Sequence, residues 1–273
     1  MRGFNPVFRA MQEYRLLLHI PVSEGLQYHI RCKPGDVAPY VLLPGDPGRV
    51  PRIAKFMDEA WEVARNREYL TYTGRYKGVP VSVTSTGIGG PSAAIAVEEL
   101  IRVGAKVFIR VGTSGGMQPF TKPGDIGIAT GAVRDEGTTR QYVPIEYPAL
   151  ADYRIVSALV EAAERLGVRY HVGIFHSKDS FYCEVKPENQ PAREIWMNRW
   201  NAWVRAGVIL SEMEAAAIFV VSSIKGALAG AVCAIIDVSG GEEIWRLNEQ
   251  GIDNAIRTAL EAVKILADRG IPG

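Results

Sequence analysis

The chain has 273 residues, of which 47% are hydrophobic, and its 31 basic residues almost balance its 30 acidic ones. This length and composition are sufficient for one large buried core. The even charge balance gives no overall field that would hold nucleic acid or an anionic membrane surface, so we expect neither as a partner. The sequence contains no run of about 18 apolar residues, which argues against a membrane-spanning helix.

The cysteines and the N-terminal segment indicate the compartment and the domain limits. Cys32, Cys183 and Cys233 are odd in number and far apart, so they match neither a disulfide framework nor a metal site. We therefore predict unpaired thiols and a cytoplasmic protein. Residues 1–26 contain an apolar run that is too short for the core of a signal peptide. We treat residues 1–26 as an N-terminal extension and residues 27–273 as one domain.

Apolar runs bounded by glycine or proline alternate with segments whose apolar residues recur at helical spacing. The runs predict buried strands at Val41–Leu43, Val79–Thr84, Val107–Ile109, Ile126–Thr130, Val172–Phe175 and Ala231–Ile236. The spacing predicts helices at Ser92–Val103, Ile155–Leu166, Glu212–Ile224 and Gly251–Asp268. Because strands and helices alternate, the sequence predicts a single α/β domain.

A further helix is predicted within residues 187–206. Trp196, Trp200 and Trp203 recur there at helical spacing, which places all three on one face. An aromatic stripe of this kind is more typical of packing than of a ligand site. We assign these side chains to the core or to a contact between subunits.

The segment Gly45–Arg49, with the sequence Gly-Asp-Pro-Gly-Arg, follows the first predicted strand and precedes a helix that opens near Gly48. Glycine allows the backbone to approach a ligand closely, and the N-terminus of a helix favours an anion. Arg49 can add a two-pronged contact. The alternative is an ordinary strand-to-helix turn with a solvated arginine.

The segment Arg110–Gly116 places an arginine at the end of the apolar run Val107–Ile109. A charge at the end of a buried strand is costly unless it is paired, and ligands of α/β sheets bind at these ends. We expect Thr113 to add a hydroxyl and the glycines to expose their backbone N–H groups. These features predict a bound anion in preference to a structural ion pair.

Two other segments contain turn and carboxylate residues. Thr86–Ser92 follows a predicted strand and opens a helix, with Pro91 suited to the first turn, and a close-packed turn explains it equally well. Ser211–Glu214 places two carboxylates at the start of a helix, where the helix dipole stabilises them. Glutamates here can also accept hydrogen bonds from a sugar diol, and both interpretations remain open.

Together these segments resemble the nucleoside phosphorylase family, and within it the branch that contains the uridine phosphorylases. The matching stretches lie between about Gln27 and Leu266 and read GDPGR, NREYLTYTG, STGIGGPSAAIAVEEL, IRVGTSGG, SKDSFY and SEMEAAA. The resemblance implies a single α/β domain with a mixed, partly closed central sheet flanked by helices. It also implies a homo-oligomer, a hexamer built as a trimer of dimers, whose sites are shared between subunits.

The resemblance implies a role for each site residue. It assigns phosphate to Gly45, Arg49, Arg67, Arg110 and Thr113, with Arg67 reaching into the neighbouring subunit. It assigns ribose to His29, Glu212, Met213 and Glu214, with His29 also crossing the interface. Phe181 would stack on the base, and Arg110 and Glu214 would be the catalytic residues. Glu68, Ile88 and Ser92 match positions that hold a monovalent cation such as K⁺ between subunits in some relatives.

The implied reaction is phosphorolysis, in which a nucleoside and inorganic phosphate give ribose 1-phosphate and a free base through an oxocarbenium-like sugar. Phosphate is the co-substrate, and no redox cofactor is required. A nucleosidase would have no use for three converging cations, and a protein that only binds nucleosides would not need both a phosphate set and a ribose set. We therefore expect a phosphorylase.

The base is where the sequence departs from the resemblance. Uridine phosphorylases place a glutamine soon after a Phe-Tyr pair, whereas Phe181 and Tyr182 are followed by Cys183 and Glu184. Glu184 is a candidate base-binding residue, although a carboxylate accepts from a ring N–H and cannot donate to a carbonyl; the alternative is that it points to solvent. Purine-specific relatives have an aspartate in a late loop, where this chain has Gly240, with Asp237 three residues earlier. We predict uridine as the substrate, with a purine or broad-specificity phosphorylase as the alternative.

Overall fold

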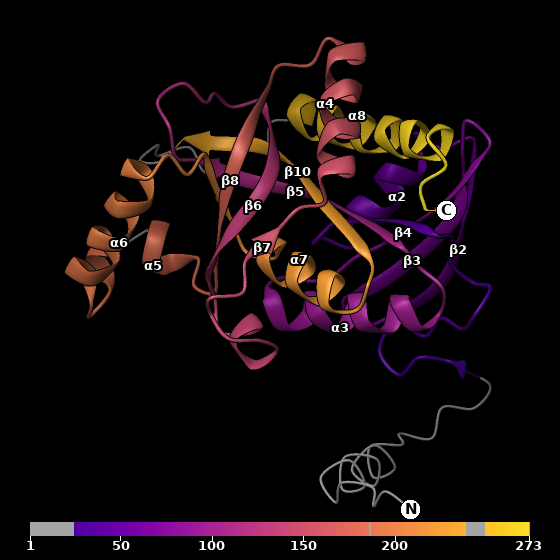
Figure 1. Ribbon diagram of the computed structural model, residues 1–273, viewed down its shortest axis with the longest axis horizontal. Coiled ribbons are helices and arrows are strands. Elements are labelled where there is room, and N and C mark those ends of the chain that lie inside the picture. The colour runs from indigo at the N-terminus through magenta and orange to yellow at the C-terminus, as the bar shows by residue number, and fades with distance from the viewer. Residues whose placement is uncertain (1–24, 186, 239–248, 273) are drawn as a thin grey trace, which may run out of the picture.

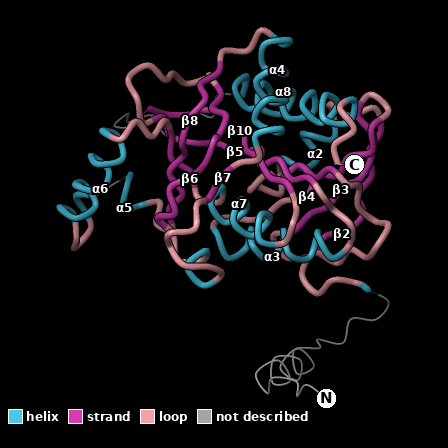
Figure 2. Tube along the Cα trace, viewed as in Figure 1, coloured by secondary structure: helices cyan, strands magenta, loops and turns pink. Residues whose placement is uncertain are grey.

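The computed structural model describes residues 25–185, 187–238 and 249–272. The strands are β1 (Tyr40–Leu43), β2 (Glu59–Asn66), β3 (Tyr69–Tyr76), β4 (Val79–Thr84), β5 (Val107–Gly116), β6 (Ile126–Asp135), β7 (Ala149–Leu150), β8 (Tyr170–Lys178), β9 (Leu210–Glu212) and β10 (Leu228–Val238). The α-helices are α2 (Arg49–Ala54), α3 (Gly90–Arg102), α4 (Tyr153–Leu166), α5 (Tyr182–Val185), α6 (Arg193–Arg205), α7 (Ala215–Ile224) and α8 (Glu249–Asp268), with 3₁₀ turns at Thr139–Gln141 and Pro187–Asn189. Strands and helices alternate as the sequence predicts (Figures 1 and 2).

One end of the sheet closes into a ring. Strand β10 pairs with β6 and also with β5, and the path β6–β8–β9–β5 completes the circle. The other end stays open, because β1 lies parallel to β5 and leads outward to β4, β3 and β2. Parallel and antiparallel pairs occur together. The predicted α/β fold with a mixed, partly closed sheet is therefore confirmed.

Helices cover both faces of the sheet, so two hydrophobic cores form (Figure 1). Helices α3 and α7 pack on one face, while α2, α4 and α8 pack on the other. Neighbouring residues of β5 divide between the cores, with Phe108 in the first and Ile109 in the second. Alternate side chains of a strand point to opposite faces, and burial of both faces explains the continuous apolar run in the sequence.

The observed elements differ from the predicted ones mainly at their ends. Strands β5, β6, β8 and β10 extend beyond their apolar runs into polar residues. The hairpin of β2 and β3 was not predicted as strands, because polar residues alternate along the exposed edge strand β2. The helix predicted to begin at Glu212 begins at Ala215, since Glu212 is the last residue of β9.

The tryptophans of helix α6 are not packed as predicted. The helix lies to one side of the sheet together with α5 (Figures 1 and 2), and none of its residues is buried within the chain. The assignment of its tryptophans to the core is therefore wrong, while a contact between subunits stays a prediction. In the part of the chain that the structure describes, no helix is long and apolar enough to cross a membrane.

Candidate active site

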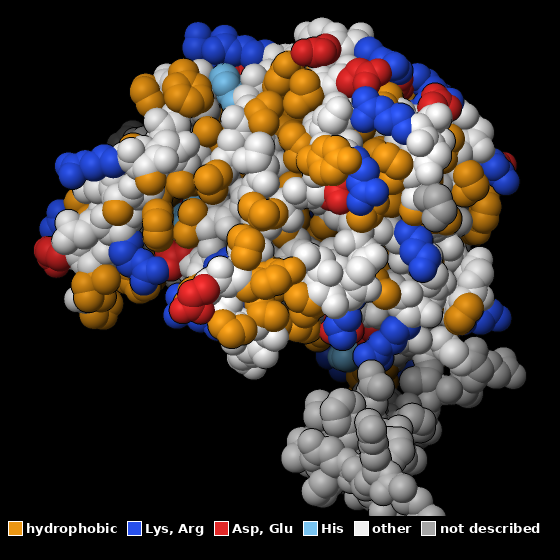
Figure 3. All heavy atoms as spheres, in the orientation of Figure 1, with side chains coloured by type: hydrophobic (Ala, Val, Ile, Leu, Met, Phe, Trp, Pro, Cys, Tyr) orange, Lys and Arg blue, Asp and Glu red, His pale blue; other side chains and the backbone are white. Residues whose placement is uncertain are grey.

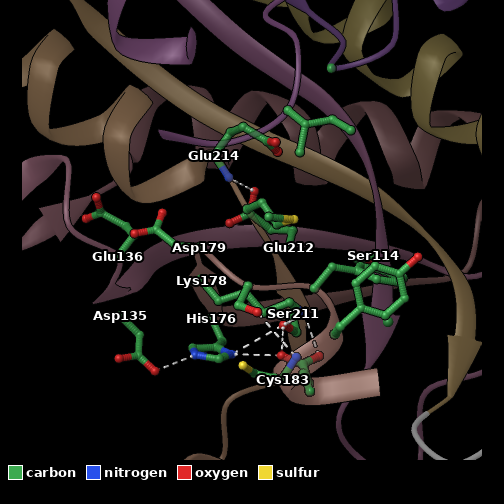
Figure 4. Close-up of a pocket in the computed structure, with 18 of the residues that line it drawn as sticks. Ser114, Asp135, Glu136, His176, Lys178, Asp179, Cys183, Ser211, Glu212 and Glu214 are labelled. Carbon is green, nitrogen blue, oxygen red and sulfur yellow. Dashed lines mark hydrogen bonds and ion pairs between the residues drawn. The ribbon is translucent and has the colours of Figure 1, made fainter. Parts of the chain in front are cut away.

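A cavity of about 1780 Å³ opens where several strands end. Its walls come from the loop after β1, from the carboxyl-end halves of β5 and β8, and from β9 with the start of α7 (Figure 4). Helices α5 and α6 form the remaining side. A site at the carboxyl ends of strands is the usual position for a ligand in an α/β sheet.

Two arginines define the first part of the cavity. Arg110, on β5, is only 3% exposed, and Arg49, in the first turn of α2, donates to the Thr113 hydroxyl at 3.0 Å. Burial, together with the positive charge of Arg110, lowers the pKa of Arg49. Two neighbouring guanidinium groups in a partly desolvated cavity repel each other, so this part of the site favours an anion.

Arg110 is anchored by two buried glutamates. Its Nε lies 2.7 Å from a Glu212 oxygen and its Nη2 lies 2.5 Å from a Glu214 oxygen. The Nε contact is an ion pair without hydrogen-bond alignment, and Nη1 has no hydrogen-bond partner among the described residues. The structural ion pair that the sequence analysis ranked below an anion is therefore present, and the bound anion stays a prediction. The arginine is fixed in position, with Nη1 left as a donor without a partner in the described part of the chain.

The glycines beside Arg110 belong to a strand. The segment Arg110–Gly116 is part of β5 and pairs with β10 along its length, so β10 occupies one edge of its backbone. A Cβ at Gly112 would lie 2.7 Å from Cys233 Sγ and 2.8 Å from Arg110 Nη2. Glycine is needed here because the guanidinium occupies that space. Gly45, after β1, lines the same cavity.

Glu212, the last residue of β9, and Glu214, which precedes α7, make different contacts. Glu212 accepts the backbone N–H groups of Glu214 at 2.8 Å and Ala215 at 2.9 Å, so it caps α7 as well as pairing with Arg110. Glu214 accepts the Gly89 N–H at 2.6 Å, and burial raises its pKa. Glu214 and Met213 line the cavity beside the arginines. Hydrogen bonds to backbone N–H groups thus hold both carboxylates in place.

The opposite side of the cavity holds Phe181, which is 40% exposed, and Glu184 on α5. Glu184 does not point to solvent, so that alternative is wrong. Its oxygens lie 2.6 Å from Lys178 Nζ and 2.8 Å from the Ser211 hydroxyl. Burial acts to raise the pKa of Glu184, but a hydrogen bond from His176 and the charge of Lys178 bring this pKa below its usual value.

Sequence reasoning missed a network behind Glu184. His176 and Lys178 lie two residues apart on β8, so both point to the same face (Figure 4). His176 contacts the Ser211 hydroxyl through Nδ1 at 3.2 Å and Asp135 through Nε2 at 3.0 Å. The signal was present in the sequence, because charged residues end an apolar run here just as Arg110 does. Trp196, Trp200 and Trp203 also line the cavity.

Two predicted residues lie outside this cavity. His29 is held by Glu99, with Nδ1 2.7 Å from Oε1, and Arg67 is exposed in the turn between β2 and β3. The single chain brings neither of them to Arg110. Their predicted service to a neighbouring subunit stays a prediction.

Other predicted residues lie at or near the cavity wall. Glu68, Ile88 and Ser92 line it together; the Ser92 hydroxyl donates to Glu68 at 2.7 Å, and Ile88 is 78% exposed. Asp237 lines the cavity near the end of β10, and Gly240 lies outside the described residues. Cys32 and Cys233 are buried and Cys183 is half-buried, all as free thiols.

Comparison with known proteins places this geometry in a family. The model of the phosphorylase superfamily matches residues 39–269. A uridine phosphorylase of Thermococcus kodakarensis is 54% identical over 90% of this chain and 88% of its own length. A guanosine phosphorylase of Halorubrum lacusprofundi is 42% identical over 88% of this chain and 99% of its own. A crystal structure of uridine phosphorylase from Vibrio fischeri ES114 aligns with a TM-score of 0.80 at 34% identity, covering 89% of this chain and 99% of that one.

Proposed function

This chain belongs to the phosphorylase superfamily, and we propose that it cleaves uridine with inorganic phosphate to give uracil and ribose 1-phosphate. The observation that carries the proposal is the pair of neighbouring guanidinium groups, Arg49 and Arg110, facing a cavity that also holds the buried carboxylate of Glu214. Phosphate accepts hydrogen bonds from Arg49 and from the Arg110 Nη1 that Glu212 and Glu214 leave without a partner among the described residues. The Glu214 carboxylate accepts hydrogen bonds from the ribose hydroxyls.

The chemistry follows from this arrangement. The glycosidic bond breaks with its electron pair passing to N1 of uracil, and the sugar becomes oxocarbenium-like. A phosphate oxygen then bonds to C1′, and the departing uracil takes up a proton from water. Arg110 and Arg49 hold the phosphate below the sugar, and Glu214 orients the ribose with Met213 beside it. Preorganised charge and positioning supply most of the rate enhancement.

We also propose that the working form is a hexamer built from dimers. Arg67 and His29 lie outside the cavity of their own chain, as residues that complete a neighbour's site would. Ile145, Leu150, Val172 and Ile174 are all more than 40% exposed, and hydrophobic side chains are numerous on the face seen in Figure 3. Exposed apolar patches of this kind mark surfaces that a partner covers.

A monovalent cation such as K⁺ is the only bound ion that we propose, with inorganic phosphate as the co-substrate. The Glu68 carboxylate and the Ser92 hydroxyl lie together at the cavity edge beside exposed Ile88, which suits a site completed by a second subunit. The free thiols at Cys32, Cys183 and Cys233 support a cytoplasmic setting.

The proposed reaction is tested by incubating the purified protein with uridine, with and without inorganic phosphate, and separating the products. We expect uracil and ribose 1-phosphate in equal amounts, only when phosphate is present. Equal release of uracil without phosphate would make the protein a nucleosidase. Release of hypoxanthine from inosine, with uridine left intact, would move it to the purine class.

The shared site is tested by mixing two inactive variants. Arg67→Ala removes the group proposed to serve the neighbour, and Arg110→Ala removes the group that serves its own chain. After unfolding and refolding together, mixed dimers contain one intact site, so about a quarter of the wild-type activity should return. Each variant refolded alone is the control. If the mixture stays inactive although mixed dimers are detected, the sites are not shared in this way.

A further inference from the structure

The ion pair between Lys178 and Glu184 lies in the wall of the cavity beside Phe181. Lys178 is 8% exposed, and its Nζ lies 5.9 Å from the centre of the Phe181 ring. The ammonium group thus lies over the Phe181 ring with the Glu184 carboxylate beside it, so both groups are in the part of the cavity where a base would stack. Charged side chains are rarely buried this far unless they are paired, and this pair faces the cavity rather than the core.

The pair keeps unused hydrogen-bonding capacity. An ammonium group has three N–H donors, and Lys178 directs two of them to Glu184 and Ser211, at 2.6 and 2.7 Å. A carboxylate has about four acceptor positions, and those of Glu184 receive Lys178, Ser211 and a longer contact of 3.5 Å from His176. Among the described residues, one donor of the ammonium group and one acceptor position of the carboxylate therefore remain unused, on two groups that lie 2.6 Å apart.

We propose that Lys178 and Glu184 together read the –CO–NH– edge of the base, which makes the substrate class nucleosides of oxo bases. Lys178 donates to the carbonyl oxygen, and Glu184 accepts from the adjacent ring N–H. Uracil presents this edge at C4 and N3, and hypoxanthine and guanine present it at C6 and N1. The inference rests on the proposed phosphorolysis and extends it from uridine to 6-oxopurine nucleosides.

The same pair excludes amino bases. Cytosine and adenine present an amino donor next to a ring nitrogen that only accepts. Against this edge the ammonium would face a donor and the carboxylate would face an acceptor. Polar groups left unpaired in a desolvated site lose binding steeply, and sites built around hydrogen bonds discriminate strongly for this reason. Cytidine and adenosine should therefore be poor substrates.

Other residues hold the pair in place. Ser211 donates to Glu184 and accepts from Lys178, so it fixes the distance between them. His176, 5% exposed, connects this group to Asp135. Asp135 in turn pairs with Arg199 on α6. Contacts from β8, β9 and α6 thus fix the positions of Lys178 and Glu184. A pair that distinguishes bases by hydrogen bonding needs fixed positions of this kind.

The first test uses the unmodified protein and a panel of nucleosides in phosphate. We expect kcat/KM for uridine and inosine to exceed that for cytidine and adenosine by at least about a hundredfold. N3-methyluridine and N1-methylinosine, which lack the ring N–H, should be disfavoured by a similar factor. Cleavage of N3-methyluridine at the rate of uridine, or inosine left intact, would overturn the inference. If no nucleoside in the panel releases its base, the proposed function itself fails.

The second test removes the pair without leaving an unpaired charge. The double variant Lys178→Met with Glu184→Leu should lose most of its preference for uridine over cytidine while its KM for phosphate stays near that of the parent. Lys77→Met is the matched control, because it breaks another 2.6 Å ion pair, with the buried carboxylate of Glu261, outside the cavity. The control should keep the preference. An unchanged preference in a folded double variant would refute the assigned role.

Discussion

Replacement of Arg110 by alanine should lower kcat/KM for phosphate by at least about a hundredfold. The guanidinium is fixed by Glu212 and Glu214 before any ligand arrives, and removal of one preorganised charge-stabilising donor commonly costs this much. The measurement is the initial rate of uracil release over a range of phosphate concentrations. Arg110→Lys keeps the positive charge but loses the planar fork, so it should fall between the parent and the alanine variant.

The control for this experiment is another arginine that joins two carboxylates. Arg52, on the same helix as Arg49, pairs with Glu249 and with Asp253 at 2.7 Å and lies outside the cavity. Arg52→Ala should therefore affect stability but leave the rate within a few-fold of the parent. Near-normal phosphorolysis in Arg110→Ala would show that phosphate is held elsewhere.

Glu214→Gln should lower kcat/KM for uridine by about a hundredfold with little change of shape. The amide keeps one acceptor oxygen for the Gly89 N–H but loses the negative charge next to the sugar. Charge-assisted hydrogen bonds are roughly twice as strong as neutral ones, and in the proposed mechanism the positive charge that develops on the sugar gains most from the carboxylate. Steady-state kinetics with uridine at saturating phosphate would measure the loss. A variant with parental kcat and KM would remove Glu214 from the mechanism.

The raised pKa of Glu214 predicts a second property of the Glu214→Gln variant, which is its melting temperature. Burial raises this pKa above its usual value near 4.5, so the folded chain holds the proton more tightly than the unfolded chain. Stability due to Glu214 therefore falls as the pH rises through the interval between the unfolded and folded pKa values, and at neutral pH the ionised group is unfavourable. The glutamine variant should melt no lower than the parent at pH 7 in phosphate-free buffer. A clearly lower melting temperature would contradict this sign.

The raised pKa of Glu214 also predicts how the activity of the parent depends on pH. Protonated Glu214 loses one acceptor position and its charge, so the rate should decline on the acid side at a pH above the ordinary carboxyl range. The group expected to cause this decline in rate is Glu214, the same group whose replacement by glutamine is not expected to lower the melting temperature. Loss of activity without loss of stability is the expected pattern for a functional residue that is energetically costly to the fold.

Sequence reasoning went furthest where one residue type could not be explained by packing alone. Arg110 interrupts an apolar run, so a partner for its buried charge was predictable. The structure shows carboxylate partners, and the anion stays a prediction. The pairing of Lys178 with Glu184 was not predictable, because no local pattern states that α5 folds back towards the end of β8. The roles proposed for His29 and Arg67 came from the family resemblance, because those roles would involve a second chain.

Glu212 supports one of the two interpretations of its motif, while hydrogen bonding to a sugar diol stays a prediction. The structure confirms that carboxylates at the start of α7 serve the helix, since Glu212 caps it. Its neighbour Glu214 is instead turned towards Gly89 and Arg110. Spacing alone could not separate these tasks, because the last residue of a strand and the cap of a helix are adjacent in the chain.

The part of the cavity around Arg110 and the part around Glu184 are built from different elements. Arg110 belongs to β5, which runs parallel to β1 on one side and to β10 on the other, so its neighbours are constrained by two strands at once. Glu184 belongs to α5, a helix of four residues that takes part in no strand pairing. Substitutions in α5 should therefore leave the strand pairing around Arg110 intact. Under the roles proposed above, the carboxylate that faces the base can change without a change in the strand that carries Arg110, so base preference and phosphate binding can be altered separately.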